Sequence, residues 1–160
     1  MPATAMKQHD PGAPPNPPLP KVYTERRFHL PDLNEKGQWL IGRLQERYPS
    51  SEGELVNWLR GLIVVGSNDY LFVRTDHAFM LAQVTKEPLV KLPIVVEQFV
   101  LCENDHEDEG AYLYTVMAQW ARGMGACELR IETQTDVHRD AIKGRIGKLW
   151  QRDQIFSKLD

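Results

Sequence analysis

The stretch from Pro93 to Thr135 constrains the fold of this chain most strongly, because its apolar pattern changes period twice. An apolar run, PIVVEQFVLC, reads as a strand, and a short polar segment, ENDHEDEG, follows it. The next segment, AYLYTVMAQWARGMG, carries an apolar stripe at helical spacing: Leu113, Met117, Trp120 and Ala121. A further segment, ACELRIETQ, reads as a strand. The sequence therefore predicts strand, acidic loop, helix and strand at the centre of an α/β (α+β) protein.

Two helices are predicted upstream of this stretch. A short strand over Arg26–Leu30 precedes a helix over Leu33–Tyr48, which Pro49 ends. Ser51 and Glu54 form a Ser-x-x-Glu capping box that opens a second helix. The apolar residues of that helix recur at helical spacing: Leu55, Trp58, Leu59, Leu62 and Ile63.

A hairpin and the remaining elements complete the predicted fold. Tyr70–Thr75 and Ala78–Thr85 read as two strands joined tightly at Asp76 and His77. The other predicted elements are strands Ile94–Cys102 and Cys127–Thr133, helix Val137–Trp150 and strand Gln154–Leu159. We therefore expect the order β-α-α-β-β-β-α-β-α-β, in a mixed, mostly antiparallel sheet flanked by helices.

The first 22 residues are predicted to form an extended arm, separate from a domain over residues 23–160. Residues 1–20 hold seven of the eleven prolines: Pro2, Pro11, Pro14, Pro15, Pro17, Pro18 and Pro20. Proline lacks an amide donor and fixes φ, which favours an extended polyproline-II conformation. The PxxP spacings suit an aromatic groove on a protein partner or on a second copy, and a flexible tail is the alternative.

Composition excludes several classes of function. The 160 residues carry a net charge of −3, which gives no general attraction to nucleic acid or to an anionic membrane. No apolar run approaches the roughly 18 residues that a membrane-spanning helix needs, and the N-terminus shows no signal peptide. We expect a cytoplasmic protein, or a virion protein if a phage encodes it. Cys102 and Cys127 are expected to be buried, reduced thiols.

The element order from Arg26 to Leu159 resembles that of the GCN5-related N-acetyltransferases (GNATs). The most specific match is GAYLYTVMAQWARGMGACELRIET, which is similar to the family's helix after its pyrophosphate loop. Gly110 falls on the last glycine of the family's Arg/Gln-x-x-Gly-x-Gly/Ala signature. Asp105 stands in place of the leading Arg or Gln, and Asp108 in place of the first glycine. The resemblance implies an acetyl-CoA cofactor, but only one of the three signature positions matches.

The charge of the predicted loop argues against that cofactor. The loop carries five carboxylates: Glu103, Asp105, Glu107, Asp108 and Glu109. Each would repel a phosphate by on the order of 3 kcal/mol at about 6 Å and an effective dielectric of about 20, and salt would screen part of this. Carboxylates also compete for the helix N-terminus that would otherwise attract phosphate. We therefore expect no cofactor, or acetyl-CoA if the protein is an enzyme.

The family's C-terminal pattern is altered as well. The positions that match its Asn, Ala, Tyr and Gly-Phe are His138, Ala141, Arg145 and Leu149-Trp150. The tyrosine that often serves as general acid is thus replaced by an arginine, which cannot donate a proton at working pH. An active enzyme would need another acid.

Some residues keep the potential for acyl transfer. Glu97 lies in the strand where the family commonly carries a catalytic glutamate, and apolar neighbours would raise its pKa into the range of a base. The alternative is that Glu97 and Gln98 simply point to solvent or to a salt bridge. If acetyl-CoA binds, the resemblance implies contacts at the following positions: Gln98, Phe99, Val100, Gly110 and Ala111.

The sequence also contains residues that could bind a metal or a partner. Cys102, His106, Cys127 and His138 do not have a recognised zinc spacing, and the acidic loop does not match a calcium loop, so we expect no metal site. The last predicted helix has a basic face: Arg139, Lys143, Arg145 and Lys148. That face would suit an acidic partner or a phosphate backbone, and a solvated face is the alternative.

We conclude from the sequence that this is a GNAT-like protein that has lost acetyl-CoA binding. It would act as a structural or adaptor component of a larger assembly, such as a phage virion, because its style is similar to GNAT-like proteins of tailed phages. Its expected partner contacts are Pro14, Pro15, Pro17, Pro18, Pro20, Arg139, Lys143 and Arg145. The alternative function is a divergent acetyl-CoA-dependent N-acetyltransferase with Glu97 as base. Neither a membrane nor a nucleic acid is an expected partner.

Overall fold

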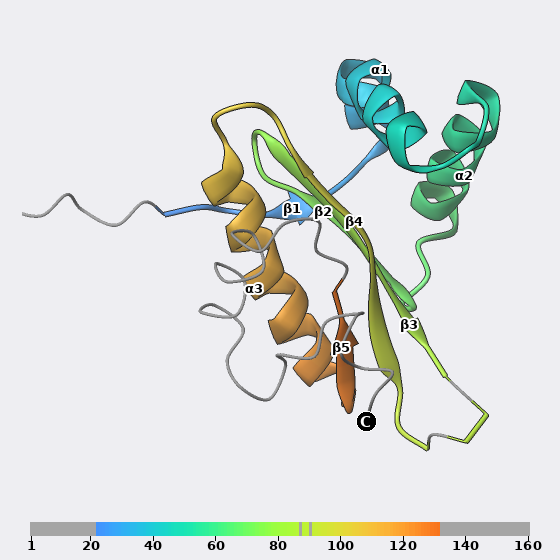
Figure 1. The fold of residues 1–160 in the computed structure, drawn as a ribbon, viewed down its shortest axis with the longest axis vertical. Helices are drawn as coiled ribbons and strands as arrows, with labels where there is room; N and C mark the ends of the chain where they lie inside the picture. Colours follow the sequence, from blue (N-terminus) through green and yellow to red (C-terminus); the bar gives the residue numbers. More distant parts are fainter. Residues whose placement is uncertain (1–21, 87, 90, 132–160) are drawn as a thin grey trace, which may run out of the picture.

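A five-stranded mixed sheet forms the centre of the molecule (Figure 1). The structure is a computed structural model that describes residues 22–86, 88, 89 and 91–131. Along the sheet the strands follow their chain order: β1 (Arg26–Arg27), β2 (Tyr70–Arg74), β3 (Ala78–Thr85), β4 (Ile94–Cys102) and β5 (Glu128–Arg130). Neighbouring strands are antiparallel except for β4 and β5, which are parallel. The predicted hairpin and the predicted strand Ile94–Cys102 are confirmed.

Helix α1 (Leu30–Arg47) begins three residues before the predicted start. His29 is its N-cap, and the backbone N–H of His29 donates to Asp32 Oδ2 at 2.8 Å in a capping box. Pro31 fits the first turn, where its missing N–H leaves no helical bond unmade. The apolar spacing alone therefore placed the start too late, because the cap is built from polar residues.

Helix α2 (Glu52–Val65) follows the predicted capping box. Glu54 N–H donates to Ser51 Oγ at 3.1 Å, and Ser51 N–H donates to the Glu54 carboxylate at 3.3 Å. The helix ends at Gly66, whose φ of +60° lies in the left-handed region that glycine adopts without a Cβ clash. The prediction that the capping box opens this helix is confirmed.

Helix α3 (Glu107–Gly123) begins inside the segment that was predicted to be loop. Its first turn consists of Glu107, Asp108 and Glu109, because carboxylates are favoured where the helix dipole is positive. The loop between β4 and α3 is therefore only residues 103–106, and three of the five predicted loop carboxylates belong to the helix.

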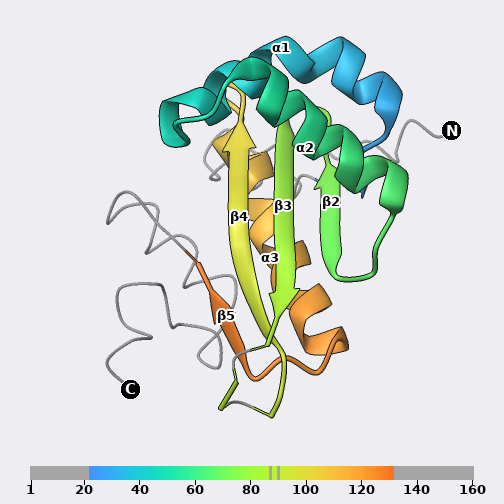
Figure 2. The same ribbon diagram turned by 90° about the vertical axis from the view of Figure 1, so that its right-hand side faces the viewer.

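The sheet is covered on both faces (Figures 1 and 2). Helices α1 and α2 bury one apolar cluster on one face: Phe28, Leu33, Leu40, Ile41, Leu44, Leu55, Leu59, Phe72, Phe79, Leu81 and Phe99. Helix α3 covers the other face with a second cluster: Val73, Ala78, Met80, Ala82, Val95, Leu113, Tyr114, Val116, Met117, Ala118, Ala121, Leu129 and Ile131. Cys102 is half-buried and Cys127 is exposed, so the expectation of two buried thiols was wrong for Cys127.

A β-bulge in β4 sets which side chains reach which core. The register of β3 and β4 shifts between Leu81, which faces Phe99, and Ala82, which faces Glu97, so Gln98 is an extra residue. The strand therefore changes phase there. Glu97 contacts α3, and Val100 packs on the same α3 cluster, although the two lie an odd number of positions apart.

Several sequence predictions fall outside the described residues. They include the arm with Pro14, Pro15, Pro17, Pro18 and Pro20, the helix Val137–Trp150 with Arg139, Lys143 and Arg145, and the strand Gln154–Leu159. The boundary between residues 22 and 23 also stays a prediction. Within the described residues, no helix is both long enough and apolar enough to cross a membrane.

Candidate functional site

The candidate site lies along the second half of β4 and the start of α3. Within the described residues, β5 pairs with β4 at Ile94, Val95 and Val96 (Figure 2). The bulge follows at Gln98, whose carbonyl accepts a hydrogen bond from the Tyr48 hydroxyl at 2.7 Å. A bulge beside a parallel pair is a place where a ligand backbone can approach a strand.

Glu97 is buried under α3 and does not point to solvent. Its side chain is 5% exposed, and its Oε1 accepts from the Tyr114 hydroxyl at 3.1 Å. Burial and then the charge of Glu97 raise the pKa of Tyr114 well above its ordinary value. Tyr114 therefore keeps its proton near neutral pH and remains a hydrogen-bond donor to Glu97. An acid–base pair of this kind lies beside the bulge.

The other predicted cofactor residues divide between the two faces of β4. Phe99 is fully buried in the α1/α2 core, whereas Val100 packs toward α3. Gly110 is in the first turns of α3, where an added Cβ would be 3.5 Å from Cys102 Sγ. Gly110 and Glu109 both donate their N–H groups to the His106 carbonyl, at 3.4 and 3.0 Å, so these amides are already used by the helix. Of the predicted contacts, only backbone groups near Gln98 lie at the bulge.

Glu103 in the β4–α3 loop is held by two donors from other elements. Lys36 Nζ of α1 lies 2.8 Å from Glu103 Oε1, and His77 Nδ1 lies 2.7 Å from Glu103 Oε2. Burial raises the pKa of Glu103, but the hydrogen bonds from Lys36 and His77 outweigh it and hold that pKa below its usual value. The next residues turn sharply, with Asp105 at a φ of +67°. Aspartate tolerates this region better than most residues.

The first turn of α3 is also tied to distant segments. Asp108 accepts from the Tyr23 hydroxyl, and the Tyr23 ring packs against Tyr112. Glu109 is 6% exposed, and its Oε1 accepts from the backbone N–H of His77 at 3.0 Å. These two carboxylates therefore have partners in the folded chain and are not simply solvated.

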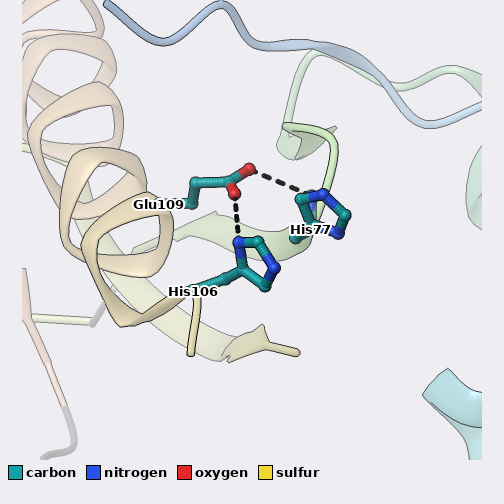
Figure 3. A group of neighbouring side chains, drawn as sticks. All are labelled: His77, His106 and Glu109. Atoms are coloured by element: carbon teal, nitrogen blue, oxygen red, sulfur yellow. Dashed lines mark hydrogen bonds and ion pairs between the residues drawn. The ribbon is translucent and has the colours of Figure 1, made fainter. Parts of the chain in front are cut away.

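His77 and His106 stack at this point, with ring centroids 3.8 Å apart and an angle of 17° between the rings. His106 Nδ1 lies 2.9 Å from Glu109 Oε2 (Figure 3). His77 comes from the β2–β3 turn, so the fold brings it to residues about 30 positions later in the chain. From the sequence, His106 was a candidate metal ligand, whereas His77 was expected only as a turn residue of the hairpin. One sequence signal pointed to a place beside His106. His77 lies in the two-residue turn that leads into the next predicted strand, and that strand pairs with β4.

Among solved structures, the chain resembles the aminoglycoside acetyltransferase meta-AAC0020 from an uncultured soil metagenomic sample, crystallised in complex with sisomicin. The TM-score is 0.56 and the identity 14%, over 77% of this chain and 86% of that chain. This chain has a GNAT-like fold. At such low identity, the likeness extends to the GNAT-like fold and not to the ligand. No family model matches the sequence, and no curated protein matches it significantly.

Proposed function

We propose that this chain is a GNAT-fold binding protein that does not use acetyl-CoA. The observation that carries the proposal is the state of the β4–α3 loop. A helix N-terminus binds phosphate through free N–H groups and positive partial charge. Here Glu103 and Glu109 lie beside that position, and Lys36, His77 and His106 hold them there.

A pyrophosphate at this loop would have to displace those contacts. Moving Glu109 away would remove a buried carboxylate from its partners, His77 and His106, and an unpaired buried charge costs several kcal/mol. Leaving Glu109 in place would set like charges side by side. Both routes weaken pyrophosphate binding. The N–H groups of Glu109 and Gly110 already donate to the His106 carbonyl, so they add no hydrogen bonds to the phosphate.

Calorimetry with acetyl-CoA on the full chain, at low and at moderate salt, tests this proposal. We expect no heat and no thermal stabilisation at millimolar cofactor. The double variant Asp105→Arg/Asp108→Gly restores two positions of the family signature and serves as the comparison, since it removes two carboxylates and adds a cation. Micromolar binding by the unaltered chain would overturn the proposal.

We further propose that the protein acts as a structural or adaptor component of a larger assembly, of which a phage virion is one example. The support is the sequence: a proline-rich arm and a basic face on a predicted helix, neither of which an enzyme of this fold requires. Native mass spectrometry after gentle purification is the test. A stable complex or homo-oligomer that is lost when Pro14, Pro15, Pro17, Pro18 and Pro20 are replaced by Ser is expected. A lone monomer would contradict this role.

A second candidate function is a divergent acyl-CoA-dependent N-acetyltransferase, which the bulge in β4 favours. Glu97 would then act as the base and Tyr114 would donate to it. If acetylation of a primary amine is detected, Glu97→Gln should reduce kcat by at least about 100-fold, the scale of a lost general base. Glu107→Gln, at an exposed carboxylate, is the control. An unchanged rate in Glu97→Gln would exclude the role of Glu97.

A further inference from the structure

Two histidines and a glutamate from different elements converge beside the start of α3 (Figure 3). One ring nitrogen of His77, one of His106 and one carboxylate oxygen of Glu109 all lie within 4.8 Å of one another. The β2–β3 turn contributes the first, and the beginning of α3 contributes the other two. We propose that these three side chains bind a transition-metal dication, with Zn²⁺ as the ion that they suit best.

The spacing of the donor atoms fits this chemistry. Zn²⁺ binds imidazole nitrogen and carboxylate oxygen at about 2.0–2.2 Å, so neighbouring ligand atoms around one ion lie about 3–3.5 Å apart. His106 Nδ1 and Glu109 Oε2 are already 2.9 Å apart. The His77 ring has to turn to bring its nitrogen closer. It is 39% exposed, which leaves room for that rotation.

Two of the three ligands are also oriented by a second contact. The Glu103 carboxylate can only accept at His77 Nδ1, so in the neutral ring Nδ1 carries the proton and Nε2 has the lone pair. Lys36 fixes Glu103 in turn. A histidine that donates its other N–H to a carboxylate is the common arrangement around protein-bound zinc. Likewise, the His77 backbone N–H holds Glu109 Oε1, and the ion would replace the proton between Glu109 Oε2 and His106 Nδ1.

The donor set favours zinc-like ions over magnesium or calcium. Imidazole suits Zn²⁺, Cu²⁺ and Ni²⁺, whereas Mg²⁺ and Ca²⁺ take oxygen ligands. Two histidines and one glutamate make three protein ligands, which leaves a fourth position for water or an anion. A bound dication would join the β2–β3 turn to α3 and offset the charge of the exposed Asp105 and Glu107. The site does not depend on whether acetyl-CoA binds.

Calorimetry with ZnCl₂ on the chelator-treated full chain is the deciding experiment. We expect one Zn²⁺ per chain with a micromolar or tighter Kd, no displacement by millimolar Mg²⁺ or Ca²⁺, and a rise in Tm. His77→Gln and His106→Gln should each weaken Zn²⁺ binding by at least about 100-fold. Glu103 only positions His77, so Glu103→Gln should weaken Zn²⁺ binding by about tenfold. Glu107→Gln and Cys127→Ser are the matched controls and should bind as the unaltered chain does.

Co²⁺ substitution supplies a readout that does not need a variant. An intense visible absorption from four-coordinate Co²⁺ that Zn²⁺ abolishes is expected. Absence of Zn²⁺ heat and of any shift in Tm would overturn the proposal. Binding that persists in the two histidine variants, or that disappears in Cys127→Ser, would also overturn it, because the ion would then lie elsewhere.

Discussion

Asp32 is a buried carboxylate that two arginines contact. It is 3% exposed and accepts hydrogen bonds from Arg26 Nη1 at 2.7 Å and from Arg74 Nη1 at 3.0 Å. Arg74 is itself buried and donates through Nη2 to the Asp76 carbonyl at 2.8 Å. One carboxylate thereby connects the start of α1 to β1, β2 and the hairpin turn. The hydrogen bond from Arg26 is the main cause of the lowered pKa of Asp32, which is about 2.

This pKa predicts how stability depends on pH. Because the folded pKa of about 2 lies below the ordinary value of 3.8, the contribution of Asp32 is full above about pH 4.5 and is lost as pH falls toward 2. A shift of this size corresponds to roughly 2 kcal/mol. Asp32→Asn should therefore lower the free energy of unfolding by about 2 kcal/mol or more at pH 7, and the difference should shrink as pH falls.

Urea unfolding of both proteins between about pH 7 and 2.5 measures that difference. The matched control is Asp69→Asn, at an exposed aspartate in the turn before β2, which should leave stability nearly unchanged at every pH. A gap between Asp32→Asn and the unaltered protein that stays constant with pH would contradict the assignment.

At the same scale, the sequence located Glu97 in its strand but not its surroundings. Alternation along β4 cannot tell which face Glu97 takes, because the extra residue at Gln98 changes the phase of the strand. The partnership of His77 with His106 was equally hidden, since it depends on the register of the hairpin against β4. Positions within an element could be predicted, whereas contacts between elements required the fold.

At the scale of elements, local patterns predicted more. The hairpin, the capping box at Ser51 and the strand Ile94–Cys102 are all present, because turn residues and apolar periods are local signals. The starts of α1 and α3 were placed too late, since the cap of α1 is built from His29 and Asp32 and α3 opens with three carboxylates, none of which the apolar period includes. Acidic residues just before an apolar helical stripe often form the first turn of the helix, because carboxylates are favoured at its N-terminus.

Two glycines of α2 give opposite predictions. Gly61 lies inside the helix with nothing within 4 Å of an added Cβ, so Gly61→Ala should stabilise the protein by about 0.5–1 kcal/mol. Gly66 ends the helix at φ +60°, so Gly66→Ala should destabilise it by about 1–2 kcal/mol. Thermal unfolding of the pair measures both, and each variant is the control for the other. Shifts of the same sign would refute the assigned end of α2.

For the whole molecule, the decisive feature is that one sheet separates two apolar cores. Phe79 and Met80 are adjacent in β3, yet the first joins the α1/α2 core and the second the α3 core. Neither core is complete without the sheet, so we expect a single cooperative unfolding transition. The sequence predicted sheet and helices but not this division, which depends on the side of the sheet to which each helix returns.

A pair of truncations tests this cooperativity. Leu44→Ala in the α1/α2 core and Met117→Ala in the α3 core, both at fully buried positions, should each cost about 2–5 kcal/mol. Both should shift one shared midpoint in urea, whether followed by far-UV circular dichroism or by tryptophan fluorescence. Val65→Ala, at a side chain that is 75% exposed, should change little. Two separate midpoints, each sensitive to one truncation, would show that the cores unfold independently.

The bulge at Gln98 makes β4 more tolerant of losing a residue there than at its neighbours. Deleting Gln98 would remove the extra residue, so Glu97, Phe99 and Val100 would keep their present faces of the sheet by regular alternation. Deleting a paired residue such as Val96 would instead turn one part of the strand onto the opposite face. In a gene, the loss of the codon for Gln98 would therefore do less damage than the loss of a codon for a paired residue of the same strand.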